Sequence, residues 1–339
     1  MKLATPRWWY VRDPAGAPVL RALLRPLSWI WAAATARRIA RATPGDAGLP
    51  VICVGNLTVG GTGKTPVVRE LLHILNARGV AAAGLARGHG GRLKGPVQVD
   101  PARHLAADVG DEPLMLAQDL RLWIARDRLA GAQAARAAGA QVVVMDDGHQ
   151  NPSLKKALSL VVVDGESRDG EWPFGDGAVF PAGPLREPLA VGLARADAVV
   201  VILPADLAAP DPELMALFAG KPVLIARIEP LAPPPLGPQL GFAGVGKPWK
   251  VERALAAAGC DLVDFIPLAD HGAYTPPIIA FLERRAAALG AGLVTTEKDW
   301  VRLPAAVQAR VIAWPVRARF EDPLALDALL ARLAPPPAP

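Results

Sequence analysis

The stretch 51–65, VICVGNLTVGGTGKT, decides the fold. Its apolar start, Val51–Val54, predicts a short strand, which runs into a glycine-rich loop ending in Gly63-Lys64-Thr65. Residues 66–78 follow as a predicted helix that stops at Gly79. A strand, a glycine loop and a helix in this order form a phosphate-binding loop, because glycines let backbone N–H groups converge on phosphate oxygens and a helix start favours anions. The stretch therefore predicts a nucleotide-binding α/β domain.

The loop also predicts which residues contact the phosphates. These are expected to be Thr58, Val59, Gly60, Gly61, Thr62, Gly63, Lys64 and Thr65. Thr58 occupies the slot in which the general pattern has its first glycine, but the remaining glycines still clear the approach to the backbone. Lys64 is expected to bridge the β- and γ-phosphates, and the Thr65 hydroxyl to ligate Mg²⁺. The alternative is a flexible glycine turn, against which the order of strand, loop and helix argues.

Further apolar runs predict the rest of the domain. Short hydrophobic segments between helices are typical of parallel strands that are buried on both faces. We expect such strands at 80–85, 142–145, 160–163, 198–203 and 223–225. Residues 112–138 predict one long helix that ends at Gly139. The fold class is therefore α/β, with a P-loop NTPase-like parallel sheet flanked by helices.

Composition divides the chain into five parts. A proline-rich linker separates the nucleotide-binding domain from a smaller α/β domain, in which strands are predicted at 240–243 and 292–295 and helices at 251–258 and 276–289. The Pro-rich tail is expected to be disordered. The expected boundaries are 1–48 for an N-terminal helical segment, 49–228 for the nucleotide-binding domain, 229–239 for the linker, 240–333 for the smaller domain and 334–339 for the tail.

Positive charge is concentrated at the N-terminal end. The chain has a net charge of +5, and residues 1–50 alone carry eight Lys and Arg against Asp13 and Asp46. A basic segment of this kind suits an anionic surface, either lipid headgroups or nucleic acid. No interleaving of arginine and aromatic residues supports nucleic acid as the partner.

Residues 19–42 predict an amphipathic helix within this basic segment. Its apolar positions follow helical spacing, with Arg21, Arg25 and Ser28 on the other face. One interpretation is an interfacial helix on an anionic membrane, with Trp29 and Trp31 at headgroup level. The other is an ordinary helix packed on the domain. The arginines interrupt the apolar run, so a membrane span is not expected. The apolar positions are Leu20, Leu23, Leu24, Leu27, Ile30 and Trp31.

Carboxylates at two places are candidates for chemistry. Asp146 and Asp147 follow the predicted strand 142–145, and a carboxylate at such a strand end holds Mg²⁺ in the Walker-B arrangement. Asp111 and Glu112 open a predicted helix. Asp111 is either a helix cap, with Glu112 favouring the helix dipole, or a general base or metal ligand, and the local pattern alone favours the cap.

Two loops add a histidine and an arginine. His271 follows Asp270 in a loop after the strand-like run 262–268, where it is either structural or orients a base. Arg186 lies between prolines, where it either stabilises a transferring phosphate or pairs with Glu187.

Taken together, these motifs resemble one family. They run in order from about residue 51 to 303, and the combination is similar to the tetraacyldisaccharide 4′-kinases of lipid A biosynthesis in Gram-negative bacteria. Thr58 in the first glycine slot and Thr-Thr-Glu-Lys-Asp at 295–299 are typical of that family. The motifs are GNLTVGGTGKTP (55–66), RG (87–88), VGDEP (109–113), MDDG (145–148), PAGPLREP (181–188), FAGVG (242–246), DH (270–271) and TTEKD (295–299).

The resemblance implies an ATP-binding kinase domain at 49–228 and a specific reaction. ATP would donate its γ-phosphate to the 4′-hydroxyl of a tetraacylated glucosamine disaccharide 1-phosphate, forming lipid IVA. The family's catalytic Asp and its assisting His fall on Asp111 and His271, which overturns the preference for a helix cap at Asp111. Arg186 matches a position suited to phosphate contact. Mg²⁺ would be held by Thr65 and by carboxylates among Glu112, Asp146, Asp147 and Glu187.

The resemblance also implies a location. The enzyme would be peripheral on the cytoplasmic face of the bacterial inner membrane, with the segment 1–48 as its anchor and no obligate protein partner. His271 lies beyond the linker, so closure of the two domains is expected to complete the site. Two positions depart from the family, because His89 stands where Tyr is usual and His149 where Phe is usual.

Two other functions remain open at this level. One is a P-loop enzyme with a different small substrate, such as a GTPase, although the guanine-reading NKxD motif is missing from the sequence. The other is a membrane adaptor switched by nucleotide, which would need the loop but neither Asp111 nor His271.

Overall fold

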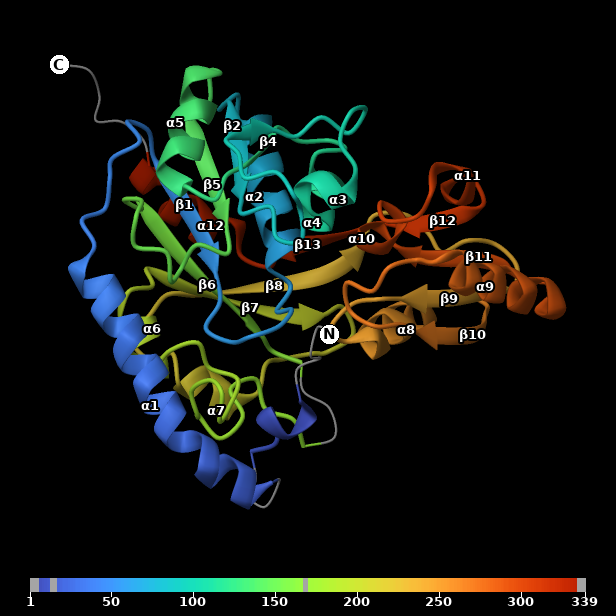
Figure 1. Ribbon diagram of the computed structural model, residues 1–339, viewed down its shortest axis with the longest axis horizontal. Helices are drawn as coiled ribbons and strands as arrows, with labels where there is room; N and C mark the ends of the chain where they lie inside the picture. Colours follow the sequence, from blue (N-terminus) through green and yellow to red (C-terminus); the bar gives the residue numbers. More distant parts are fainter. Residues whose placement is uncertain (1–5, 13–16, 167–169, 334–339) are drawn as a thin grey trace.

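Two sheets organise the chain into a larger and a smaller α/β domain (Figure 1). The computed structural model describes residues 6–12, 17–166 and 170–333. The disordered tail expected at 334–339 lies outside these residues, as do residues 1–5 and 13–16 of the N-terminal segment. The predicted α/β class is confirmed.

The larger sheet has nine strands with β1 near its middle. All neighbouring strands from β8 to β4 run parallel, and only the edge strands β13 and β3 run antiparallel to their partners. Cys53 of β1 lies opposite Met145 on one side and Ser159 on the other. In spatial order the strands are β13 (Val316–Phe320), β8 (Val223–Pro230), β7 (Ala198–Pro204), β6 (Leu158–Asp164), β1 (Val51–Gly55), β5 (Val142–Asp146), β2 (Ala82–Ala86), β4 (Leu122–Ile124) and β3 (Val97–Gln98).

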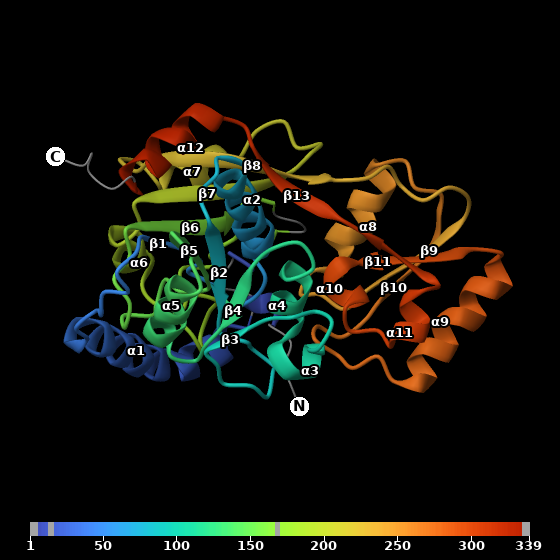
Figure 2. The ribbon, with the colours of Figure 1, turned by 90° about the horizontal axis from the view of Figure 1, so that it is seen from above.

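Helices cover both faces of this sheet (Figure 2). Side chains alternate along β1, so Ile52 and Val54 pack in the core beneath α2 and α12, whereas Val51 and Cys53 pack beneath α5. Burial on both faces explains why the strands are almost entirely apolar. The helices are η1 (Arg7–Trp9), α1 (Pro18–Arg41), α2 (Lys64–Ala77), α3 (Ala106–Val109), α4 (Asp111–Leu116), α5 (Arg128–Ala137), α6 (Leu189–Ala194), α7 (Pro212–Ala216), α12 (Pro323–Leu330) and η2 (Ala331–Leu333).

The smaller domain repeats this layering around a parallel sheet of four strands. Leu282 of α9 packs on one face with Leu240 and Phe242, and Leu255 of α8 packs on the other with Val294. The strands, in spatial order, are β10 (Leu262–Pro267), β9 (Gln239–Ala243), β11 (Gly292–Thr296) and β12 (Val311–Trp314). The helices are α8 (Pro248–Ala257), α9 (Pro276–Leu289), α10 (Glu297–Trp300) and α11 (Ala305–Gln308).

The C-terminal part of the chain differs from the expected boundaries. After β12 the chain returns to the larger domain, where β13 pairs with β8 along its length and α12 packs beside α2. The chain therefore crosses between the domains twice, side by side, and Leu231 N donates to Pro315 O at 2.9 Å where it does so. The expected linker is also shorter, because β8 extends to Pro230.

The single helix expected at 112–138 is wrong. The region instead holds α4, the buried strand β4 and α5. Helical periodicity could not separate them, because β4 has only three residues and its neighbours are good helix formers. The local signal was Asp127, whose side chain caps α5 by accepting a hydrogen bond from Ala130 N at 3.1 Å.

Helix α1 packs on the larger domain through its polar side chains. Arg21 is buried and pairs with Asp176, and Ser28 Oγ donates to Val179 O at 2.7 Å. Most of its hydrophobic side chains point outward, Leu23 and Trp29 each being 69% exposed. Trp31 instead contacts the domain, with its ring 4.9 Å from that of Phe180 and Nε1 donating to Arg186 O at 3.1 Å. No helix in the described ranges has the length and apolar content needed to cross a bilayer. The exposed hydrophobic residues of α1 are Val19, Leu20, Leu23, Leu27, Trp29, Ile30 and Trp31.

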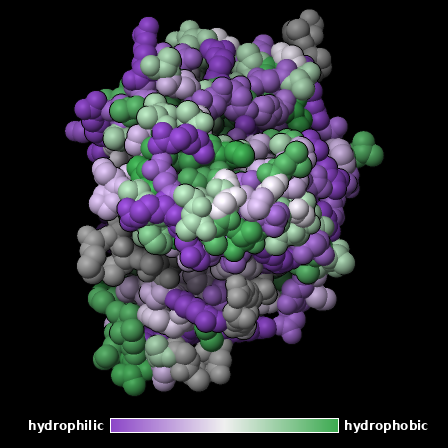
Figure 3. Space-filling view, turned by 90° about the vertical axis from the view of Figure 1, so that its right-hand side faces the viewer, coloured by the Kyte–Doolittle hydropathy of each residue, from purple (hydrophilic) through white to green (hydrophobic). Residues whose placement is uncertain are grey.

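The surface view supports this orientation. In Figure 3, most of the face on the side of the smaller domain mixes hydrophilic and hydrophobic atoms. A hydrophobic group stands at the lower edge of that view, at the height where α1 begins in Figure 1. At the start of α1, Val19 is 72% exposed and Leu23 69% exposed.

Packing of the C-terminal segment can be tested with one helix. Leu326→Ala removes a side chain that is 1% exposed in the core of the larger domain, so the free energy of unfolding should fall by about 2–5 kcal/mol in urea titrations. Leu324→Ala, on the same helix but 80% exposed, is the control and should change it by less than about 0.5 kcal/mol. Equal effects of the two substitutions would contradict this placement.

Candidate active site

The glycine loop joins β1 to α2 as predicted. Gly60 and Gly63 have positive φ values of 107° and 78°, a region that side chains with a Cβ rarely occupy. Gly63 is also the N-cap of α2, and a Cβ there would lie 2.6 Å from Ile202 Cδ1. The loop therefore needs glycine at position 63 for both backbone conformation and space.

The segment 184–186 holds the start of the loop in place. Val59 N donates to Pro184 O and Arg186 N donates to Leu57 O, each at 2.8 Å, so that Thr58 pairs with Leu185 in an antiparallel bridge. The Arg186 side chain adds a bond from Nε to Thr58 O at 2.9 Å. Backbone pairing thus fixes this position, which accounts for a threonine where other loops of this type have glycine.

Asp147 brings two predicted cations together. Its Oδ1 lies 2.7 Å from Arg186 Nη1 and 3.7 Å from Lys64 Nζ. Burial alone would raise the pKa of Asp147, but the charges of Lys64 and Arg186 outweigh it and lower the pKa to about 2. Lys64, Asp147 and Arg186 therefore meet at the carboxyl edge of the sheet, and Arg186 does not pair with Glu187.

Asp146, at the end of β5, is the carboxylate best placed for a cation. It is 5% exposed, and its Oδ1 has no hydrogen-bond partner. Burial, followed by the charge of Glu112, raises its pKa from 3.8 to about 7. Thr62 Oγ1, in the glycine loop, is buried and unpartnered as well. Buried polar atoms are rarely left unpaired, so both atoms are available to a ligand.

Asp111 and His271 come from different domains and meet. His271 Nδ1 lies 2.7 Å from Asp111 Oδ2. The N-cap of α4 is Gly110 and not Asp111. The Oδ1 atom of Asp111 instead accepts a hydrogen bond from Glu112 N at 2.9 Å. Burial would raise the pKa of Asp111, but the hydrogen bond from His271 and the charge of Lys298 lower it to about 2. Asp111 is thus a carboxylate at neutral pH.

Lys298 is the site residue that the sequence motifs did not single out. It belongs to α10 and donates from Nζ to Glu112 Oε1 at 2.9 Å, with His271 Nε2 at 3.3 Å from the same atom. Burial would lower the pKa of Lys298, but Glu112 and Asp111 raise it above the ordinary value. Its only sequence signal was its place in the Thr-Thr-Glu-Lys-Asp run, to which no role was given.

Glu187, another predicted metal ligand, is paired with two protein side chains. It is 1% exposed, its two oxygens accept bonds from Arg195 Nη2 at 2.6 and 2.7 Å, and Gln150 Nε2 adds a bond of 3.0 Å. These partners satisfy the carboxylate without a metal. Within the described part of the chain, no three His, Cys, Asp or Glu side chains gather into a metal-binding group.

The two histidines that depart from the family pattern have different surroundings. His149 is buried, with Nε2 2.9 Å from Gly192 O and Nδ1 3.2 Å from Ser159 Oγ, and burial lowers its pKa to about 4. It is therefore a neutral packing residue. The His89 ring lies 6.3 Å from that of His271, so this position borders the Asp111–His271 pair.

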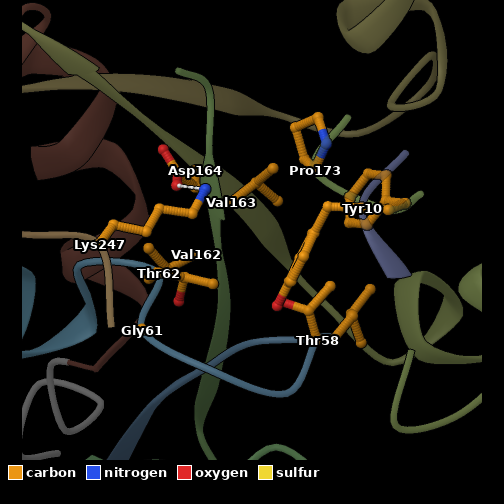
Figure 4. Close-up of a pocket in the computed structure, with 11 residues that line it drawn as sticks. Tyr10, Thr58, Gly61, Thr62, Val162, Val163, Asp164, Pro173 and Lys247 are labelled. Carbon is orange, nitrogen blue, oxygen red and sulfur yellow. Dashed lines mark hydrogen bonds and ion pairs between the residues drawn. The ribbon is translucent and has the colours of Figure 1, made fainter. Parts of the chain in front are cut away.

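A small pocket lies beside the glycine loop (Figure 4). Its volume of about 10 Å³ holds about one water molecule. Thr58, Gly61 and Thr62 line it from the loop, and Lys247 of the smaller domain lines it from the other side, bonded to Asp164 at 2.9 Å. A Cβ on Gly246, the preceding residue, would lie 3.8 Å from Gly61 N. The smaller domain therefore reaches the glycine loop directly.

The raised pKa of Asp146 has a measurable consequence for stability. Since its folded pKa of about 7 exceeds the ordinary 3.8, the folded state loses stability as pH rises through this window. Without nucleotide or metal, Asp146→Asn should raise the melting temperature at pH 8 and change it little at pH 4. Asp261→Asn, which removes an exposed carboxylate, controls for net charge. A melting-temperature difference that is the same at both pH values would contradict the burial of this charge.

Comparisons with known proteins agree with the site. The family model described as Tetraacyldisaccharide-1-P 4′-kinase matches residues 20–334. A tetraacyldisaccharide 4′-kinase of Caulobacter vibrioides is 70% identical over 330 residues, covering 97% of this chain and 98% of the relative. One of Phenylobacterium zucineum is 69% identical over 333 residues, covering 98% of this chain and 100% of the relative.

A solved structure is similar over nearly the whole fold. It is the crystal structure of LpxK from Aquifex aeolicus in complex with ATP, with a TM-score of 0.72 and 26% sequence identity, covering 93% of this chain and 99% of that chain. Sequence similarity over nearly the whole chain and similarity of fold thus point to the same kind of kinase. The chain belongs to the tetraacyldisaccharide-1-phosphate 4′-kinase family.

Proposed function

We propose that this protein transfers the γ-phosphoryl group of ATP to the 4′-hydroxyl of a tetraacylated glucosamine disaccharide 1-phosphate, a step of lipid A biosynthesis. The observation that carries this proposal is the Asp111–His271 pair, which joins the two domains at 2.7 Å beside the glycine loop. A nucleotide-switched adaptor would need no such pair. The relatives named above, at up to 70% identity, carry the same activity in their names.

Asp111 is the general base in this proposal. As a carboxylate held by His271 and Glu112 N, it can accept the proton of the attacking hydroxyl while its position stays fixed. Phosphoryl transfer needs little further chemistry from the protein beyond positioning and charge. Lys64 and Arg186, both held by Asp147, supply positive charge at the transferring group.

Magnesium would be held by few protein atoms. Thr65 in the first turn of α2 and the unpartnered Asp146 are the proposed ligands, because Glu112, Asp147 and Glu187 are paired with Lys298, Arg186 and Arg195. Held by these two residues, Mg²⁺ would neutralise negative charge on the phosphates of ATP. Neither Glu112 nor Glu187 is needed for this set.

The outward hydrophobic face of α1 supports a place on a membrane. Hydrophobic side chains that lie beside a basic segment favour an anionic lipid surface. We place the protein peripherally on the cytoplasmic face of the inner membrane, where a lipid substrate with acyl chains would be held. No protein partner is needed for this arrangement.

The general-base assignment is tested by transfer of ³²P from ATP onto the disaccharide acceptor. Asp111→Ala and His271→Ala should each lower kcat/KM by about 10²–10⁴-fold, as expected for loss of general-base catalysis. ATP affinity, measured by calorimetry on the same variants, should stay within about twofold. Near wild-type transfer by either variant would exclude the mechanism, and transfer to no lipid acceptor by the wild type would exclude the substrate.

The membrane proposal is tested by sedimentation with anionic phospholipid vesicles. Leu23→Glu replaces one outward leucine of α1, and the loss of its burial in lipid should weaken binding by about 10-fold or more. Leu236→Glu makes the same change at a side chain that is 96% exposed on the linker and should leave binding unchanged. Equal binding by both variants would show that α1 is not the contact.

A further inference from the structure

Four residues form a closed ring of hydrogen bonds across the domain boundary, and Glu112 closes it through its backbone N–H, which donates to Asp111. Asp111 and Glu112 come from the first turn of α4, and His271 and Lys298 come from the smaller domain. We propose that Lys298 is a positioning residue that keeps His271 in the tautomer protonated at Nδ1 and thereby holds the Asp111–His271 pair in its catalytic arrangement. The inference deepens the proposed function and takes its catalytic meaning from it.

The donor and acceptor roles in the ring follow from Lys298. An ammonium group can only donate hydrogen bonds, so His271 Nε2, 3.3 Å from Lys298 Nζ, is the acceptor. Asp270 Oδ1 also faces Nε2, but at 3.7 Å it is beyond hydrogen-bond distance. The ring proton of a neutral His271 is then on Nδ1, from which it is donated to Asp111 Oδ2 at 2.7 Å. The second bond of Lys298, to Glu112 Oε1 at 2.9 Å, anchors the ammonium to the turn that carries Asp111.

Buried hydrogen bonds hold the segment that carries Lys298. Its neighbour Asp299 is fully buried and accepts bonds from Gly244 N at 3.1 Å and Tyr274 OH at 2.8 Å. Gly244 lies in the segment 244–246, and Tyr274 lies just after His271. The Asp299 carboxylate therefore connects the two loops next to the histidine. A group held in this way can orient a catalytic side chain closely.

His271 needs such support because its own backbone is strained. Its φ of 53° lies in the left-handed region, which residues with a side chain rarely adopt. Bonds at both ring nitrogens hold the ring in one orientation despite this. With Nδ1 facing Asp111 and Nε2 facing Lys298, both ring nitrogens of His271 have a partner.

The tautomer can be observed directly by NMR. In protein labelled with ¹⁵N-histidine, long-range ¹H–¹⁵N correlations distinguish a protonated from an unprotonated ring nitrogen. The chain has five histidines, and the His271→Gln spectrum identifies the signals of His271. We expect Nδ1 protonated and Nε2 unprotonated in the wild type, an appreciable Nε2–H population in Lys298→Met, and the wild-type pattern in Lys298→Arg, which retains donors.

Kinetics and a matched control complete the test. Lys298→Met should lower kcat by about 10²-fold with KM for ATP within about twofold, and Lys298→Arg should recover part of kcat. Lys250→Met is the control, because Lys250 also joins the domains, to Asp164 at 2.5 Å and Glu166 at 3.0 Å, without touching His271. It should leave the tautomer unchanged.

Three results would overturn the inference. They are an Nε2–H tautomer in the wild type, an unchanged tautomer in folded Lys298→Met, and the same tautomer change in Lys250→Met, which would assign the effect to the domain contact as a whole. The wild-type spectrum decides the matter even if Lys298→Met does not fold. The spectra need no lipid substrate, so a failed transfer assay would reject the proposed function without touching this result.

Discussion

Parallel pairing of β5, β1 and β6 is the constraint on which the site depends. Because parallel strands end at the same edge of a sheet, the pairing places the glycine loop after β1 between Asp146 of β5 and Asp164 of β6. The two carboxylates then serve different purposes. Asp146 is left with an unpartnered oxygen beside the loop, whereas Asp164 binds Lys247 and Lys250 of the smaller domain. One register thus organises both phosphate binding and the contact between domains.

Charge pairs join the domains on two sides of the glycine loop. On one side Asp164 and Glu166 meet the lysines at the start of α8. On the other, Glu297 accepts two bonds from Arg69 of α2, at 2.7 and 2.9 Å. Glu297, Lys298 and Asp299 are consecutive. Glu297 contacts α2, Lys298 contacts the Asp111–His271 pair, and Asp299 contacts the segment 244–246. A single turn of helix in the smaller domain therefore touches three parts of the site.

Much of this could be predicted from the sequence, because the strands are short apolar runs and the glycine loop has a distinctive pattern. Two kinds of feature could not be predicted from the sequence. The first is length: β4 is too short to interrupt a helical pattern, and β13 carries polar residues typical of an edge strand. The second is pairing between distant residues. Local sequence could not show that Arg186 pairs with Asp147, that Glu187 is neutralised by Arg195, or that Lys298 reaches Glu112.

For α1, spacing identified the hydrophobic stripe, but only the tertiary contacts of Arg21 and Ser28 show which way it faces.

The double crossing of the chain has a mechanical consequence. A single tether lets a domain swivel about any axis, but here two antiparallel strands, β8 and β13, cross together and are hydrogen-bonded to each other. Twisting the smaller domain about the direction of these strands would shear their ladder, whereas flexing across them would not. The smaller domain is therefore expected to flex across these two strands more easily than it rotates about them.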